Sequence, residues 1–307
     1  MIVRPAQHWF PTLFIWRGSV INNILPRLGL NLLVASFAVI TQPYCDSLGL
    51  HLTTAPFSLL GISIAIFLGF RTNTSYARFN EARCLWGSLL ISTRTIIRQV
   101  HGLLSDPAES QRVGQLLVAF VWSLNHQLRN TDARADLERL LSAPVCDNVV
   151  SSPNSSLRTN RILLLLGEWL GAQYRTGKIS DNVYVAIDRQ LSEMAHVQAA
   201  CERLANTPIP FAYSLILKRT VYLFCTVLPF ALVDDLRFLT PFVSVFISYT
   251  FLAMETVAEE IEEPFGTAPN DLALNAICTT IETNVLEMND MRPLPTPPQP
   301  DANFNLI

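Results

Sequence analysis

The sequence predicts an all-α membrane protein, with four transmembrane helices per subunit joined to a large helical cytoplasmic domain. Half of the 307 residues are hydrophobic and only 15% are charged, whereas an ordinary soluble domain carries about 25% charged residues. The apolar residues also gather in long runs that contain no lysine or arginine. Much of the surface is therefore expected to face lipid. The net charge of -3 excludes the basic character that is typical of nucleic-acid binders.

Residues 1–27 form the first expected segment, a cytoplasmic or interfacial arm. Its arginines are interrupted by tryptophans and prolines. The arm lacks the compact apolar region and cleavage site of a signal peptide. We therefore expect it to lie along the membrane surface.

Residues 28–70 are expected to hold transmembrane helices 1 and 2. Asp46 is the only charged residue from Leu28 to Phe70. A membrane-spanning helix needs about 20 mostly apolar residues. The runs Leu28–Tyr44 and Ala55–Phe70 nearly reach that length, which is typical of helices partly shielded by protein neighbours.

Residues 211–254 are expected to hold transmembrane helices 3 and 4, at Phe211–Val233 and Phe238–Met254. Asp234, Asp235 and Arg237 lie in the short connection between them.

Basic residues near the spans predict the orientation, because lysine and arginine favour the cytoplasmic side. The loop between spans 1 and 2 has none, and the loop between spans 3 and 4 has only Arg237. We therefore expect a multi-pass protein of the cell membrane, with both termini cytoplasmic. The basic residues on the other side of the spans are Arg17, Arg27, Arg71, Arg78, Arg83, Arg203, Lys218 and Arg219.

Residues 71–210 are expected to form the cytoplasmic helical domain, and residues 255–290 a cytoplasmic C-terminal helical segment. Apolar residues recur at three- and four-residue steps through the domain, as on one face of a helix. Residues 291–307 are expected to be a flexible tail, because five prolines fall within Arg292–Pro300. The individual helices expected are Val113–Arg129, Arg161–Arg175, Asp181–Leu204 and Asp271–Met288.

We expect no enzyme, because no nucleotide-binding, nucleophile-elbow or zinc-protease motif occurs and the histidines are dispersed. The cysteines are also single, which predicts neither a disulfide framework nor a zinc site. A dense acidic cluster at Glu259, Glu260, Glu262 and Glu263 could do acid–base chemistry. The simpler interpretation is a solvated or cation-attracting face.

The second span carries the most informative pattern. Ser58, Ile62, Ile66 and Phe70 lie four residues apart, so they stack along one helix face. If several copies surround an axis, the Ile and Phe side chains form rings and hence a narrow apolar neck. Such a neck can gate ions by dewetting. The alternative is an ordinary stripe that faces lipid or the protein core.

Four segments together resemble the bestrophin family, in particular its short bacterial members. They are the RGS motif at Arg17–Ser19, the second span with its extension at Pro56–Phe79, and the segments Pro208–Phe224 and Glu259–Asn275. The resemblance covers nearly the whole chain.

This resemblance implies a homopentamer with one central pore, in a lipid bilayer. It also implies that Ile62, Ile66 and Phe70 form the pore neck. A second, cytoplasmic constriction is implied within 180–185, where Asn182 and Val185 are both candidates.

Calcium regulation is not expected. Animal bestrophins follow their Pro-Phe-Gly motif with an acidic run that binds calcium, whereas in this chain only Asp271 keeps an acid there. Calcium takes about 6–8 oxygen ligands. Asp271 is thus a weak metal candidate, and we expect it to cap the following helix instead.

The resemblance to bacterial members, together with charge at the outer mouth, predicts a channel for monovalent cations such as Na⁺ and K⁺. Asp46, Asp234 and Asp235 oppose a single Arg237 on the expected outer loops, and vestibule charge sets ion preference. One alternative is an anion (chloride) channel of the same architecture. The others are a transporter, which would need broken helices, and a membrane-anchored scaffold, which would not need the apolar face.

Overall fold

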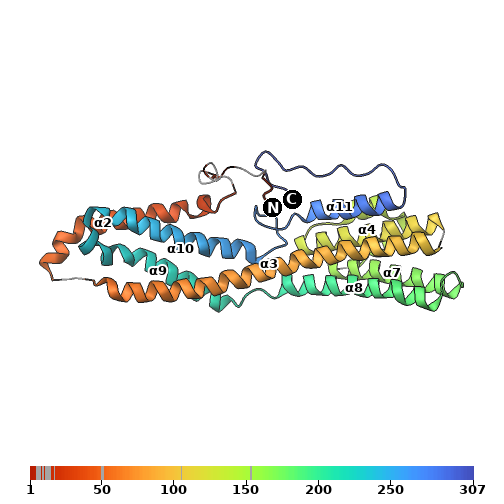
Figure 1. Ribbon diagram of the computed structural model, residues 1–307, viewed down its shortest axis with the longest axis horizontal. Helices are drawn as coiled ribbons and strands as arrows, with labels where there is room; N and C mark the ends of the chain where they lie inside the picture. Colours follow the sequence, from red (N-terminus) through yellow and green to blue (C-terminus); the bar gives the residue numbers. More distant parts are fainter. Residues whose placement is uncertain are drawn as a thin grey trace. The chain divides into compact units, whose positions relative to one another are not determined.

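The computed structural model describes residues 1–4, 8, 10, 15–16, 18–49, 52–104, 106–152 and 154–307 (Figure 1). Arg17, one of the basic residues used to predict the orientation, lies outside them. The described residues confirm the all-α class, since their only β-structure is an isolated bridge between Ile2 and Asn305. The helices are α2 (Ile21–Ser47), α3 (Thr54–Leu104), α4 (Pro107–Arg129), α5 (Arg134–Leu140), α6 (Ala143–Val150), α7 (Ser155–Arg175), α8 (Asp181–Asn206), α9 (Phe211–Leu236), α10 (Thr240–Glu262) and α11 (Leu274–Met288), with a 3₁₀ turn η1 (Arg237–Leu239).

The chain divides into two compact units. We call the first the membrane unit, which comprises residues 5–79 and 208–263. The second, the helical body, comprises residues 1–4, 80–207 and 264–307. The continuous helix α3 contributes its first half to the membrane unit and its second half to the helical body.

Three helical stretches among the described residues are long and apolar enough to cross a membrane, namely Ile21–Ser47, Thr54–Leu104 and Phe211–Glu262. The last of these is divided by η1 into α9 and α10, which pack against each other. Arg237, at the division, has a φ of 47°, a conformation that does not continue an α-helix. The break therefore falls where the sequence predicts the short connection.

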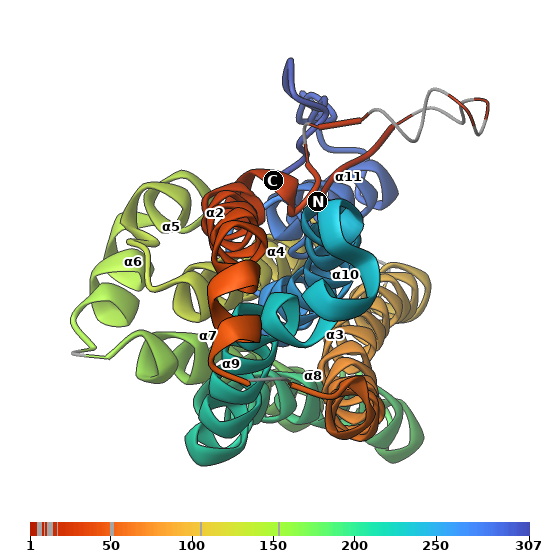
Figure 2. The ribbon, with the colours of Figure 1, turned by 90° about the vertical axis from the view of Figure 1, so that its left-hand side faces the viewer.

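An apolar core joins the helices of the membrane unit. Ile24 of α2, Ile64 of α3, Phe224 of α9 and Leu252 of α10 are all buried in it. Figure 2 shows α2, α9 and α10 end-on, and each pair of these helices is in contact. Asn31 adds a buried polar link, because its amide donates to the Cys225 carbonyl at 2.6 Å and accepts from Ser244.

The helical body is built around α4, which contacts α5, α7, α8 and α11. This helix starts earlier than the sequence predicts, because Asp106 caps it by accepting from the backbone N–H groups of Ala108 and Glu109. Pro107 occupies the first turn, where its missing N–H costs nothing. The short helices α5 and α6 were not predicted, since seven and eight residues are too few for a clear period.

The C-terminal tail is anchored at its end, in contrast to the flexible tail that its prolines predict. The Val3 N–H donates to the Phe304 carbonyl at 2.9 Å, and the Leu306 N–H donates to the Met1 carbonyl at 2.8 Å. The two termini consequently lie side by side (Figure 1). Amino-acid composition cannot predict these backbone hydrogen bonds, because they join residues at opposite ends of the sequence.

All six cysteines are free thiols. Cys201 and Cys278, in the helical body, are fully buried. Burial raises the pKa of the Cys201 thiol to about 12. Such a thiol stays protonated at neutral pH and behaves as a small apolar group.

Candidate functional site

One face of α3 leaves a row of large apolar side chains uncovered in the isolated chain. Ile62 is 60% exposed, Ile66 is 53% exposed and Phe70 is 60% exposed. We call these three residues the exposed stripe. Ser58, one turn before Ile62, is also exposed, and its hydroxyl donates to the Thr54 carbonyl of the same helix. The structure thus places the three predicted neck residues on one accessible face.

The opposite face of α3 is packed into the membrane unit. Ile64 and Leu68 are 2% and 0% exposed. Gly61 lies close to α9, since a Cβ added there would sit 3.4 Å from the Phe224 ring. The small residue lets the two helices approach closely here. This packing buries the side of α3 that lies opposite the exposed stripe.

A buried carboxylate, Glu255 of α10, binds basic side chains from three other helices. Arg71 of α3, which is 3% exposed, donates from Nη1 to Glu255 Oε1 at 3.3 Å. Arg27 of α2 and Lys218 of α9 each approach a Glu255 oxygen at 3.8 Å. Glu255 itself is fully buried. A buried charge is tolerated only when it is paired, so these four helices are held together by one set of charges.

The charge cluster also sets the rotation of α3. Arg71 directly follows Phe70, and successive residues on a helix point about 100° apart. With Arg71 held inward by Glu255 and by Glu262 at 3.3 Å, Phe70 is held outward. Arg78, two turns further on, donates from Nε to the Glu262 carbonyl at 3.1 Å.

The acidic cluster that the sequence predicts as a solvated face is mostly engaged by the protein. Glu259 pairs with Lys218 at 2.9 Å, and Glu260 accepts from Asn23 at 3.0 Å. Glu262 pairs with Arg71. Glu263 is exposed and fits the solvated interpretation. Sequence reasoning missed Glu255 because it lies just before the cluster, in an apolar run.

The three candidate outer-mouth acids lie at helix ends in the membrane unit. Asp46 is exposed near the end of α2 and accepts from Gln42 at 3.0 Å. Asp234 is half-buried and lines a cavity of about 330 Å³ together with Gln42 and Cys45. Asp235 is exposed. Asp46 is thus hydrogen-bonded within α2, and Asp234 lines a cavity between α2 and α9.

The candidates for the cytoplasmic constriction, Asn182 and Val185, lie in the first turns of α8. Both are exposed, Val185 by 64%. They belong to the helical body, whereas the exposed stripe belongs to the membrane unit.

Asp271 does not cap a helix, contrary to the expectation. Helix α11 begins at Leu274, and no side chain caps it. Asp271 is buried, and its Oδ2 instead accepts from the Ala268 N–H at 2.7 Å, which closes a tight turn. Arg129 fastens the same loop by donating to the carbonyls of Phe265 and Leu272. Among the described residues, no three His, Cys, Asp or Glu side chains converge to hold a metal ion.

The chain is similar to known proteins in both its sequence and its fold. Residues 1–287 match the family model described as Bacterial/Fungal Bestrophin protein. The chain is 50% identical to the voltage-dependent anion channel-forming protein YneE of Salmonella typhimurium and 48% identical to that of Escherichia coli. Each alignment covers all of both chains. A crystal structure of a bacterial bestrophin homolog from Klebsiella pneumoniae superposes with a TM-score of 0.85 at 56% identity, covering 88% of this chain and all of that one.

The predicted cation selectivity is wrong by this comparison, because relatives at about half identity over the full length are named as anion channel-forming proteins. The prediction relied in part on acids in the connecting loops. Charge on a loop acts on ions only where it faces their path. Asp46 instead accepts a hydrogen bond from Gln42, and Asp234 lines a cavity together with Gln42. The expectation that the chain is not an enzyme is confirmed by the same relatives.

Replacing the buried carboxylate by an amide should destabilise the membrane unit. Glu255→Gln removes the negative charge while three cations remain, and breaking a buried ion pair costs about 3–5 kcal/mol. We expect a clearly lower midpoint of thermal unfolding for the purified protein in detergent. Glu259→Gln is the matched control, because its ion pair is half-exposed and such pairs contribute about 0–1 kcal/mol. Equal midpoints for the two variants would contradict the role given to Glu255.

Proposed function

Since the chain belongs to the bacterial and fungal bestrophin family, we propose that it forms an anion channel in which five copies surround a central pore. In this proposal α2, the first half of α3, α9 and α10 are the four membrane-crossing helices of each subunit. The exposed stripe of α3 lines the pore neck. The observation that carries the proposal is this uncovered apolar row, which lies opposite the buried Ile64 and Leu68 on the same helix.

The stripe has the chemistry that a hydrophobic gate requires. Ile62, Ile66 and Phe70 span two helical turns, about 12 Å along the axis. Five such rows would enclose a channel with no polar side chain to replace the hydration shell of an ion. A constriction of this kind passes ions only when it is wide enough to stay wet.

Arginines on the second half of α3 supply the charge that an anion pathway needs. After Phe70 this helix carries five arginines and one glutamate. Arg83, Arg94 and Arg98 are exposed. The first two donate to the neutral side chains of Asn80 and Asn284. Glu81, the one acid, is paired with Arg203. Exposed guanidinium groups without carboxylate partners favour anions in a vestibule.

The proposed orientation of the protein in the membrane rests on the charge cluster around Glu255. Arg27, Arg71 and Lys218 come from three different membrane helices and meet at Glu255. Basic residues concentrate on the cytoplasmic side of a membrane. We therefore place this end of the membrane unit, both termini and the candidates Asn182 and Val185 in the cytoplasm.

Shortening the neck side chains should raise ion flux. Ile66→Ala and Phe70→Ala would each widen the dry segment and lower the barrier to wetting. The matched control is Phe67→Ala, because Phe67 is half-exposed but points about 100° away from Ile66. Flux is measured with the purified protein in liposomes. Unchanged flux in both neck variants, or an equal rise in the control, would remove the stripe from the gate.

Ion preference is tested directly by the reversal potential in a planar bilayer under a KCl gradient. We expect a potential near the chloride equilibrium value. Arg98→Gln should move it toward zero, since one guanidinium per subunit is lost from the vestibule. Arg134→Gln, an exposed arginine on α5, should leave it unchanged. A wild-type potential near the potassium value would overturn the anion assignment.

A further inference from the structure

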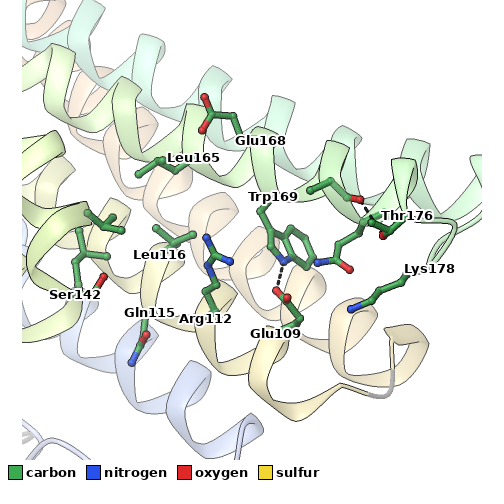
Figure 3. A pocket seen from close by; sticks show the side chains of 14 residues that line it. Glu109, Arg112, Gln115, Leu116, Ser142, Leu165, Glu168, Trp169, Thr176 and Lys178 are labelled. Carbon is green, nitrogen blue, oxygen red and sulfur yellow. Dashed lines mark hydrogen bonds between the residues drawn. The ribbon is translucent and has the colours of Figure 1, made fainter.

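A cavity in the helical body is lined by none of the residues that the proposed function uses for ion conduction. It has a volume of about 510 Å³ and is lined by residues of α4, α6 and α7 and of the segments after α5 and α7 (Figure 3). Pockets for small molecules commonly measure about 300–1,000 Å³. The cavity is therefore large enough for a metabolite of modest size.

The charges that line this cavity balance. Glu109 and Glu168 oppose Arg112 and Lys178. Glu109 accepts from the Trp169 indole N–H at 2.7 Å, and Lys178 approaches Asp106 at 3.5 Å. Within the part of the chain that the structure describes, Arg112 and Glu168 make no ion pair, and both are exposed. Figure 3 shows the Glu168 carboxylate pointing away from Arg112 and Trp169. Arg112 thus remains available for an anionic group of a ligand.

A buried acceptor in the cavity lacks a donor. Gln173, on α7, lines the cavity and is only 5% exposed. Its Oε1 is buried and accepts no hydrogen bond from the residues that the structure describes. Buried polar atoms are nearly always hydrogen-bonded. The unsatisfied carbonyl oxygen therefore points to a ligand with an N–H or O–H donor.

Part of the remaining wall is apolar. Leu116 of α4 and Leu165 of α7 line it, together with the ring of Trp169. Figure 3 shows Leu116 and Arg112 on α4 facing the α7 side chains Leu165 and Trp169. The indole is held in place through its hydrogen bond to Glu109. An apolar group of the ligand would be buried against these side chains.

We propose that this cavity binds a zwitterionic, amphipathic small molecule, of which an α-amino acid with an apolar side chain is the chemical class. The ligand carboxylate pairs with the Arg112 guanidinium. The ammonium donates to Gln173 Oε1. The apolar side chain packs on Leu116, Leu165 and Trp169. The proposal stands on the helical body alone and does not depend on the ion that the membrane unit conducts.

Isothermal titration calorimetry on the purified full-length protein tests the ligand class. The probe is L-phenylalanine, compared with phenylacetate, which lacks the ammonium, and 2-phenylethylamine, which lacks the carboxylate. A charge-assisted hydrogen bond corresponds to at least about a tenfold change in Kd. We expect each analogue to bind at least about tenfold more weakly than L-phenylalanine. An analogue that binds as tightly as L-phenylalanine would overturn the zwitterionic assignment, and no heat with L-phenylalanine, L-leucine or L-tryptophan would overturn the site.

Two variants locate the binding. Gln173→Leu and Arg112→Gln should each weaken L-phenylalanine binding at least about tenfold. Arg175→Gln is the matched control, because Arg175 is an exposed arginine of α7 that does not line the cavity. A thermal-unfolding midpoint like that of the wild type shows that each variant is folded. Unchanged binding in both cavity variants would place the ligand elsewhere and overturn the proposal. Since calorimetry reads binding directly, its outcome is separate from that of the conductance experiments.

Discussion

One buried carboxylate organises the membrane unit. Glu255 lies at the meeting point of α2, α3, α9 and α10, where it is surrounded by the cationic groups of Arg27, Arg71 and Lys218. Leaving any of these charges buried without a partner would be strongly unfavourable. The helices must therefore pack in one rotation and register. The apolar core around Phe224 adds contact area but is less directional than this charge pairing.

The orientation of α3 follows from that constraint and leads to the proposed pore. With Ile64, Leu68 and Arg71 directed into the unit, Ile62, Ile66 and Phe70 are left for a second copy or for the ion path. An apolar row decides whether ions pass and is indifferent to the sign of their charge. In the proposed channel, the arginines further along the same helix supply the sign.

The sequence predicted the class, the apolar runs and the shared face of Ile62, Ile66 and Phe70, because these depend on local periodicity. It could not predict the Glu255 cluster, since Arg71 and Glu255 are 184 residues apart. The role of Asp271 was wrong for a similar reason, as a turn to Ala268 takes its carboxylate away from α11. The predicted ion preference was wrong because loop composition does not reveal which way the Asp46 and Asp234 side chains point. The cavity around Gln173 also lay beyond prediction, because the side chains that line it come from separate helices.

The central claim is that Glu255 holds α3 so that the exposed stripe faces the ion path. Cysteine accessibility tests it most directly, in a background where the accessible Cys45 and Cys84 are serine. A charged, membrane-impermeant methanethiosulfonate reagent should block current through the Ile66→Cys channel and leave the Phe67→Cys channel unaffected. Adding Glu255→Gln should reduce this difference, because Arg71 then keeps only its ion pair with Glu262 and the rotation of α3 is less firmly fixed. Equal modification at positions 66 and 67 with Glu255 intact would contradict the account.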